Sequence, residues 1–225
     1  MTRTSTVVGK LLGLAAILLA SSSAWAATIY NNTATNQNLI FPVGTYSVAG
    51  NNVTVLEIGD QVTVNGLGNR ITDMFVGISL TNASGNETAR LNIYADSASG
   101  QPTTLLFSSA AQPLVNGFVE YVFQGIGADI QGSSTVTWMV QFAGIEAGES
   151  AGLAVFGSPT VGTTFDDIWI RAGGTFESKN IAGAFQPEGF YARIIAVPEP
   201  SSFALLALAG VAGLGFRRLM RRRSA

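Results

Sequence analysis

The 225-residue sequence predicts an all-β fold, with one jelly-roll-like β-sandwich domain between an N-terminal signal helix and a C-terminal transmembrane helix. Between residues 27 and 197, short segments alternate apolar and polar residues, which is the period of a strand with one buried face. Glycine, asparagine, serine and proline separate these segments, as turns require. The same region has no apolar run with the period of a helix. These observations divide the chain into residues 1–26, 27–197 and 198–225.

Residues 1–26 have the three parts of a secretory signal peptide. Two basic residues precede an apolar run over 11–20, and Ala24-Trp25-Ala26 forms a small-x-small site that places cleavage before Ala27. As a helix, the apolar run would span about 15 Å, which is half of a hydrocarbon core. We therefore expect export through the Sec machinery and cleavage, rather than a permanent N-terminal anchor.

Residues 27–197 are enough for one hydrophobic core and too few for two comfortable domains. The clearest strand has apolar residues at every second position, namely Val136, Trp138, Val140 and Phe142. Residues 74–80 and 119–123 repeat this alternation. The other predicted strands are 38–41, 45–48, 53–58, 61–64, 89–95, 103–108, 152–156, 167–171 and 190–196. About a dozen short strands between turns favour a sandwich.

One segment of this region also resembles a known kind of domain. Residues 91–96 read Leu-Asn-Ile-Tyr-Ala-Asp, and 97–106 read Ser-Ala-Ser-Gly-Gln-Pro-Thr-Thr-Leu-Leu. The segment is similar to the strand, turn and strand of choice-of-anchor sandwich domains, which occur attached to surface-sorting tails. The resemblance implies a β-sandwich, in agreement with the alternation.

The composition excludes several function classes. The chain has no cysteine and no histidine, which removes disulfides, thiolate and histidine nucleophile systems, and the usual nitrogen and sulfur ligands of zinc. Residues 27–197 hold 5 basic and 13 acidic residues, a net charge of −8, whereas the two ends are basic. A nucleic acid partner needs a basic face, so we expect none.

The C-terminus carries a different pattern. Pro198-Glu199-Pro200 must end the last strand, because proline fits neither a strand ladder nor a helix interior. An apolar segment, 203–216, follows, and an arginine cluster closes the chain. The cluster consists of Arg217, Arg218, Arg221, Arg222 and Arg223. A transmembrane helix over about 201–220 would cross the membrane with the arginines on the cytoplasmic side and residues 27–197 exported.

This order of features resembles the PEP-CTERM sorting signal of exported Gram-negative bacterial proteins. The matching features are the Pro198-Glu199-Pro200 triplet, the short helix rich in alanine, leucine and glycine, and the terminal arginines. The resemblance implies an intermediate anchored in the inner membrane, with the body in the periplasm. It further implies that exosortase cleaves near the motif and passes the body to the cell surface or to an extracellular, biofilm-forming polysaccharide matrix.

Acidic residues offer few catalytic or metal-binding options. Asp166 and Asp167 are adjacent, and in a strand they would point to opposite faces, so an acidic turn before the next strand is the simpler interpretation. A glycosidase needs two carboxylates about 5 to 10 Å apart, and no such pair is evident. Calcium is the more natural ion, with Asp96, Asp166 and Asp167 as candidate ligands, although turn formation explains the same residues.

Trp169 is the aromatic candidate for a ligand contact. It alternates with Ile168 and Ile170, so it faces away from them, where it would either stack on a sugar or fill a second apolar face. Trp138 lies in the apolar register of its own strand and is expected in the core. Tyr94 and Tyr191 could join Trp169 only if the fold brings them together.

These observations predict a non-enzymatic, exported surface or matrix protein without an obligatory cofactor, processed by exosortase and associated with exopolysaccharide. The alternative is a carbohydrate-binding or calcium-binding module with a defined ligand. A secreted glycoside hydrolase is the third interpretation.

Overall fold

The computed structural model describes residues 26–48, 51–64, 70–97, 99–130, 134–180 and 189–197. Every regular element in these ranges is a β-strand, which confirms the all-β prediction. Two seven-stranded sheets hold most strands, and β3 (Gly44–Val48) pairs with β4 (Asn51–Val55) in a separate hairpin. No helix long and apolar enough to cross a membrane occurs in the described ranges. The predicted signal helix and transmembrane helix lie outside them.

Sheet I has the strand order β1-β16-β6-β12-β15, with β10 on the other side of β6 and β2 beside β12. Its strands are β1 (Ala27–Asn32), β2 (Asn36–Pro42), β6 (Arg70–Thr81), β10 (Gly117–Asp129), β12 (Ser150–Phe156), β15 (Gly189–Phe190) and β16 (Ala192–Val197).

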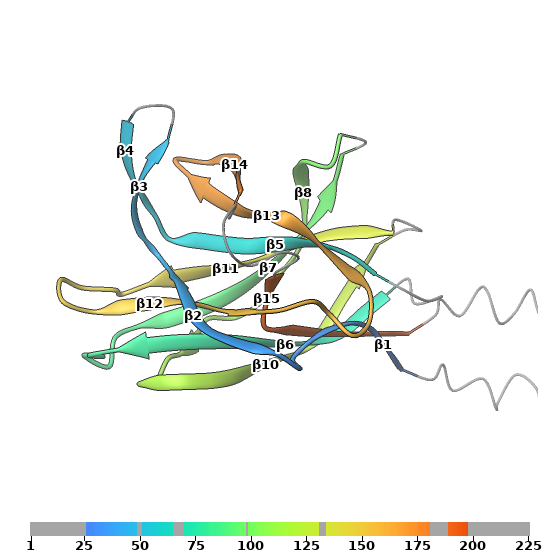
Figure 1. Cartoon of the computed structure of the whole chain (residues 1–225), viewed down its shortest axis with the longest axis horizontal. Helices are drawn as coiled ribbons and strands as arrows, with labels where there is room; N and C mark the ends of the chain where they lie inside the picture. The colour runs from blue at the N-terminus through green and yellow to red at the C-terminus, as the bar shows by residue number, and fades with distance from the viewer. Residues whose placement is uncertain are drawn as a thin grey trace, which may run out of the picture. The chain divides into compact units, whose positions relative to one another are not determined.

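Sheet II is antiparallel, with the order β14-β13-β5-β11-β7-β8 and a short β9 beside β7. Its strands are β5 (Glu57–Thr63), β7 (Thr88–Asp96), β8 (Pro102–Ser108), β9 (Gln112–Pro113), β11 (Thr135–Ala143), β13 (Thr163–Ala172) and β14 (Thr175–Asn180). In Figure 1, sheet II forms the upper layer and sheet I the lower layer, with the β3–β4 hairpin rising beyond the upper one.

One hydrophobic core joins the two sheets. Val76 and Ile78 enter it from β6 of sheet I, and Leu91 and Trp138 enter it from β7 and β11 of sheet II. These are the apolar positions of the alternating segments, so the face predicted to be buried is the buried face in each case. Because both sheets contribute to one core, they pack face to face as in a β-sandwich.

The strand order relates the two sheets to a jelly roll. Sheet I contains the series β2-β12-β6-β10, and sheet II contains the series β5-β11-β7-β8. The chain passes from β2 to β5, β6 and β7 and then from β10 to β11 and β12, so it alternates between the layers. This is the connectivity of an eight-stranded jelly roll, to which β13 and β14 add two strands at the β5 edge.

Three of the predicted boundaries are wrong. The segment 190–196 was expected as one strand, but it is divided between β15 and β16, which Tyr191 joins. The segments 53–58 and 61–64 were expected as separate strands, but Glu57–Thr63 is one continuous strand that includes Gly59. Asp166 and Asp167 were expected in a turn, but they lie within β13, where the pairing with β5 shifts between Thr164 and Ile168. A bulge of this kind accommodates extra residues without ending the strand.

The loop between β6 and β7 is held by the buried carboxylate of Glu87. The Ser84 hydroxyl donates a hydrogen bond to it at 2.8 Å, and the Gly85 N–H donates another at 2.9 Å. Desolvation acts to raise the pKa of Glu87, but the hydrogen bonds to its ionised form lower the pKa to about 2. The ionised carboxylate therefore stabilises this loop.

We expect Glu87→Gln to reduce the acid sensitivity of the fold. Because the pKa of Glu87 is lowered from 4.5 to about 2, its contribution to stability is present above pH 4.5 and is lost as the pH falls toward 2. The free energy of unfolding of the variant should therefore fall less steeply over this window. Urea unfolding at several pH values measures this, and identical slopes for both proteins would contradict the assignment.

Candidate functional site

The outer face of sheet II gathers polar and aromatic side chains from strands far apart in the sequence. On β13, Ile168 and Ile170 point into the core, so Trp169 and Arg171 point to the opposite face. Glu57 of β5 pairs with Arg171 across the two strands. Asn92 and Tyr94 reach the same face from β7 and contact the Glu57 carboxylate.

Glu57 is the centre of this group and is only 4% exposed. Its Oε1 accepts hydrogen bonds from the Tyr94 hydroxyl at 2.6 Å and from Asn92 Nδ2 at 2.8 Å. Arg171 Nη1 lies 3.4 Å from Glu57 Oε2 and 3.2 Å from the Tyr94 oxygen. A buried carboxylate with this many partners is a satisfied structural group, because its charge is balanced and its oxygens are occupied.

The same contacts hold Tyr94 in its neutral form. Desolvation by burial raises the pKa of Tyr94 well above its usual value, and the hydrogen bond to Glu57 raises it further. The guanidinium of Arg171 acts in the opposite direction. Tyr94 therefore remains a hydrogen-bond donor to Glu57 across the physiological range and is not available as a base.

Trp169 lies beside this group in a small apolar cluster on the outer face of sheet II. The cluster contains Tyr94 and Met139, and Phe176 of β14 packs against it. The Tyr94 and Phe176 rings meet edge to face with centroids 4.9 Å apart. Trp169 is 5% exposed, so its ring is buried in a second apolar face of the sheet. Of the two interpretations that the sequence allowed, this is the packing one, and the ring is not an open surface on which a sugar could stack. Tyr94 does join Trp169, whereas Tyr191 lies on sheet I.

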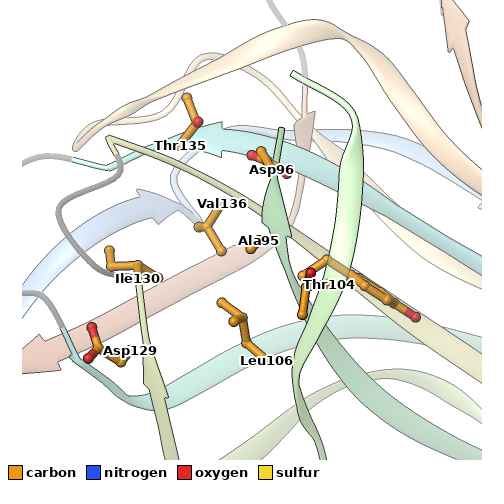
Figure 2. Close-up of a pocket in the computed structure, with 9 residues that line it drawn as sticks. Ala95, Asp96, Thr104, Leu106, Asp129, Ile130, Thr135 and Val136 are labelled. Carbon is orange, nitrogen blue, oxygen red and sulfur yellow. The ribbon is translucent and has the colours of Figure 1, made fainter. Parts of the chain in front are cut away.

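Asp96 ends β7 and lines a hollow of about 430 Å³ (Figure 2). Asp129, from the end of β10, lines the same hollow, together with Thr104 and Thr135. The remaining lining residues are Tyr94, Ala95, Leu106, Ile130 and Val136. In Figure 2, Asp96 and Asp129 lie at opposite sides of the apolar residues Val136 and Leu106. The hollow thus combines an apolar wall with two carboxylates.

The carboxylate of Asp96 is only partly satisfied. Its Oδ1 accepts a hydrogen bond from the Thr137 hydroxyl at 2.6 Å, and its Oδ2 is buried without a hydrogen-bond partner among the described residues. Desolvation raises the pKa of Asp96, while its hydrogen bonds lower it by a smaller amount. The ionised form is therefore less stable in the folded protein than in water.

We expect Asp96→Asn to stabilise the fold at neutral pH by up to about 1 kcal/mol. Because folding raises the pKa of Asp96 above 3.8, this carboxyl contributes most below pH 3.8, and the contribution is lost as the pH rises through the raised pKa. Asparagine carries no charge, so the variant does not lose this stability at neutral pH. Its amide oxygen still accepts the hydrogen bond from the Thr137 hydroxyl. Urea unfolding at pH 7 and at pH 3 tests this, since the gain should vanish at pH 3. A loss of stability at pH 7 would contradict it.

The structure does not bring the other acidic candidates to the hollow by any described contact. Asp167 pairs through its backbone with Asn180 of β14, and Asp166 lies in the irregular stretch of β13. The side chains of both lie outside the described residues. No group of three or more acidic side chains that could hold a metal ion occurs within the described residues.

Sequence reasoning did not identify Glu57, Arg171 or Asp129. Glu57 and Arg171 each lie next to an apolar residue of the alternating pattern. This position predicts that their side chains lie on the outer face of a strand, but it does not predict which strand lies beside them. Their pairing depends on β13 lying next to β5, although Glu57 and Arg171 are 114 residues apart in the chain. Asp129 lines the same hollow as Asp96 because of long-range packing that no local pattern reveals.

The described fold ends at the start of a second feature. Val197 closes β16, and residues 196–223 match the PEP-CTERM protein-sorting motif. A comparison with curated proteins found no match. The predicted triplet Pro198-Glu199-Pro200 and the arginine cluster fall inside the matched range, which lies outside the described residues beyond Val197.

An all-β body followed directly by a sorting motif defines a class of exported protein that is anchored in a membrane before its release. The chain carries a PEP-CTERM protein-sorting motif at residues 196–223. This motif implies exosortase as the processing partner.

Proposed function

We propose that this protein is a non-enzymatic structural or adhesive component of the cell surface or extracellular matrix, associated with exopolysaccharide. The observation that carries the proposal is the sorting motif at residues 196–223, which begins in the last strand of the body. A body placed so close to the motif is delivered by the processing step itself.

The small range of catalytic groups in the composition supports a passive role. Without cysteine or histidine, carboxylates are the main catalytic groups available. One of them, Glu57, is buried and occupied by Tyr94, Asn92 and Arg171. The adjacent pair Asp166 and Asp167 lies in the stretch of β13 where the pairing with β5 shifts. A carboxylate that is buried and occupied, as Glu57 is, does not suit the two facing carboxylates of a glycosidase.

The matrix role is tested by fractionating producing cells. Cells that make exopolysaccharide should retain the processed protein in the polysaccharide fraction, whereas cells unable to synthesise the polysaccharide should release it into the medium. An unrelated secreted protein of the same cells serves as the control and should not change its distribution. Equal release from both cell types would contradict the matrix role while leaving the sorting intact.

A second candidate function is calcium binding at the hollow beside Asp96. The observation that favours it is that Asp96 and Asp129 line one hollow together with Thr104 and Thr135, because oxygen atoms are the ligands that calcium prefers. Calorimetric titration of the full chain in detergent micelles should show heat with Ca²⁺ and none with Asp96→Asn. Equal heats for the two proteins, or none for the wild type, would reject this candidate.

A further inference from the structure

The outer face of sheet I carries an aromatic cluster that the function proposed above does not use. Phe118 of β10, Phe156 of β12 and Tyr191, which joins β15 to β16, meet there although they are distant in the sequence. Tyr191 meets Phe156 and Phe118 edge to face, with centroid distances of 4.8 and 5.7 Å. The Phe118 and Phe156 rings are inclined by only 26°, with centroids 6.4 Å apart. We call these three residues the aromatic face.

Gly77 of β6 makes this arrangement possible. A Cβ at this position would lie 2.7 Å from Phe118 Cε2 and 2.8 Å from Tyr191 Cβ and Cγ. Any other residue would therefore push the two rings away from the sheet. The Gly77 N–H also donates a hydrogen bond to the Tyr191 carbonyl at 3.1 Å, which fixes the backbone under the ring. The Phe118 and Tyr191 rings can pack directly against the sheet because Gly77 has no side chain. A glycine in the middle of a strand normally weakens the strand, so its packing role here is notable.

The aromatic face is open to solvent on the side of β10. Phe118 is 47% exposed. Val122 lies four residues further along β10 on the same face and is also exposed. Burying such a side chain is favourable, so an exposed phenylalanine held in place by two further rings indicates a surface that contacts a partner.

Polar groups with balanced charge border the rings. The Tyr191 hydroxyl donates a short hydrogen bond to Glu120 of β10. The Arg193 guanidinium lies 3.9 Å from the centroid of the Phe75 ring. Desolvation and the hydrogen bond to Glu120 raise the pKa of Tyr191 to about 12, so this hydroxyl keeps its proton at neutral pH. The border thus offers one carboxylate, one guanidinium and a fixed hydroxyl.

We propose that the aromatic face binds a neutral polysaccharide, with Phe118 stacking against the apolar face of a sugar ring and Glu120 and Arg193 contacting its hydroxyl groups. A sugar ring has an apolar face of C–H groups and a polar rim of hydroxyls, which is the pattern of rings and border groups on sheet I. This inference rests on the association with exopolysaccharide proposed above and names the site and the chemical class of the ligand.

The charge of the body favours this ligand over two others. Residues 27–197 carry a net charge of −8, so two copies of the body repel each other, and an acidic polysaccharide is repelled as well. Glu120 and Arg193 carry opposite charges beside the rings, so these two groups together favour neither an anionic nor a cationic ligand. A neutral glycan meets neither repulsion.

Affinity electrophoresis of the full chain in detergent micelles tests the proposal. The gels contain the neutral polysaccharides dextran, hydroxyethyl cellulose or glucomannan, or the acidic polysaccharide alginate. We expect at least one neutral polysaccharide to retard the wild-type protein and alginate not to retard it. Phe118→Ala and Phe118→Leu should each weaken the binding about tenfold or more, because both remove the ring, whereas Phe118→Tyr should bind like the wild type.

Phe165→Ala is the matched control, since Phe165 is 39% exposed on β13 of the other sheet. It should bind like the wild type. No retardation by any neutral polysaccharide, full binding by Phe118→Leu, or equal loss in Phe165→Ala would overturn the proposal. Self-association that Phe118→Ala abolishes would assign the aromatic face to a second copy and would also overturn it. Because the assay uses purified protein, these outcomes are independent of the cell fractionation that tests the matrix role.

Discussion

Replacing Trp138 by alanine is expected to lower the free energy of unfolding by about 3–5 kcal/mol. Trp138 is fully buried at the middle of β11 and meets the Phe190 ring edge to face at 6.2 Å, so it joins the two sheets across the core. Its Nε1 has no hydrogen-bond partner among the described residues, which means that the loss comes from packing and the cavity alone. Urea unfolding followed by circular dichroism measures it.

Phe165→Ala is the control for the loss of an aromatic ring. Because the Phe165 ring is exposed, this variant should change the free energy of unfolding by less than about 0.5 kcal/mol. Trp138→Phe should fall between the two, because it keeps an aromatic ring in the core. If Trp138→Ala lost less than about 1 kcal/mol, the shared core between the two sheets would be contradicted.

Gly59→Ala is expected to be similarly damaging, by about 3 kcal/mol or by preventing folding. A Cβ on Gly59 would overlap the carbonyl oxygen of Trp138 and lie 2.5 Å from Met139 Cα in the neighbouring strand. The added methyl group must therefore separate β5 from β11, which are central strands of sheet II. Expression yield and thermal unfolding of the variant measure the effect.

Gly44→Ala is the matched control, because no atom lies within 4 Å of the corresponding Cβ. It should change the free energy of unfolding by less than about 0.5 kcal/mol. Equal stability of Gly59→Ala and Gly44→Ala would show that β5 and β11 do not approach as closely as described.

The alternation of apolar and polar residues was sufficient to predict the strands that contribute to the core. Residues such as Met74, Val76 and Ile78 repeat at every second position, and burial depends only on that local period. The same reasoning failed at Gly59, which was expected to separate two strands. The sequence does not distinguish a glycine at the end of a strand from a glycine inside a strand that allows close approach of a neighbouring backbone. The difference is a tertiary contact with Trp138 and Met139.

The candidate sites were less predictable than the fold. The outward direction of Trp169 followed from its neighbours, but its burial depends on Phe176 and Tyr94, which belong to other strands. Asp96 was identified as a polar candidate, whereas its partner across the hollow, Asp129, comes from a strand of the other sheet. Short sorting motifs are readable from the sequence because a processing enzyme recognises them as linear segments, independently of the fold.

The mass of the mature C-terminus tests the central claim most directly. Mass spectrometry of the intact protein from wild-type cells should show a body that lacks residues 203–225, whereas cells without exosortase should keep them. Substituting alanine for all of Pro198, Glu199 and Pro200 should reproduce the unprocessed mass in wild-type cells. The same C-terminal mass in both cell types, still including residues 203–225, would contradict processing by exosortase.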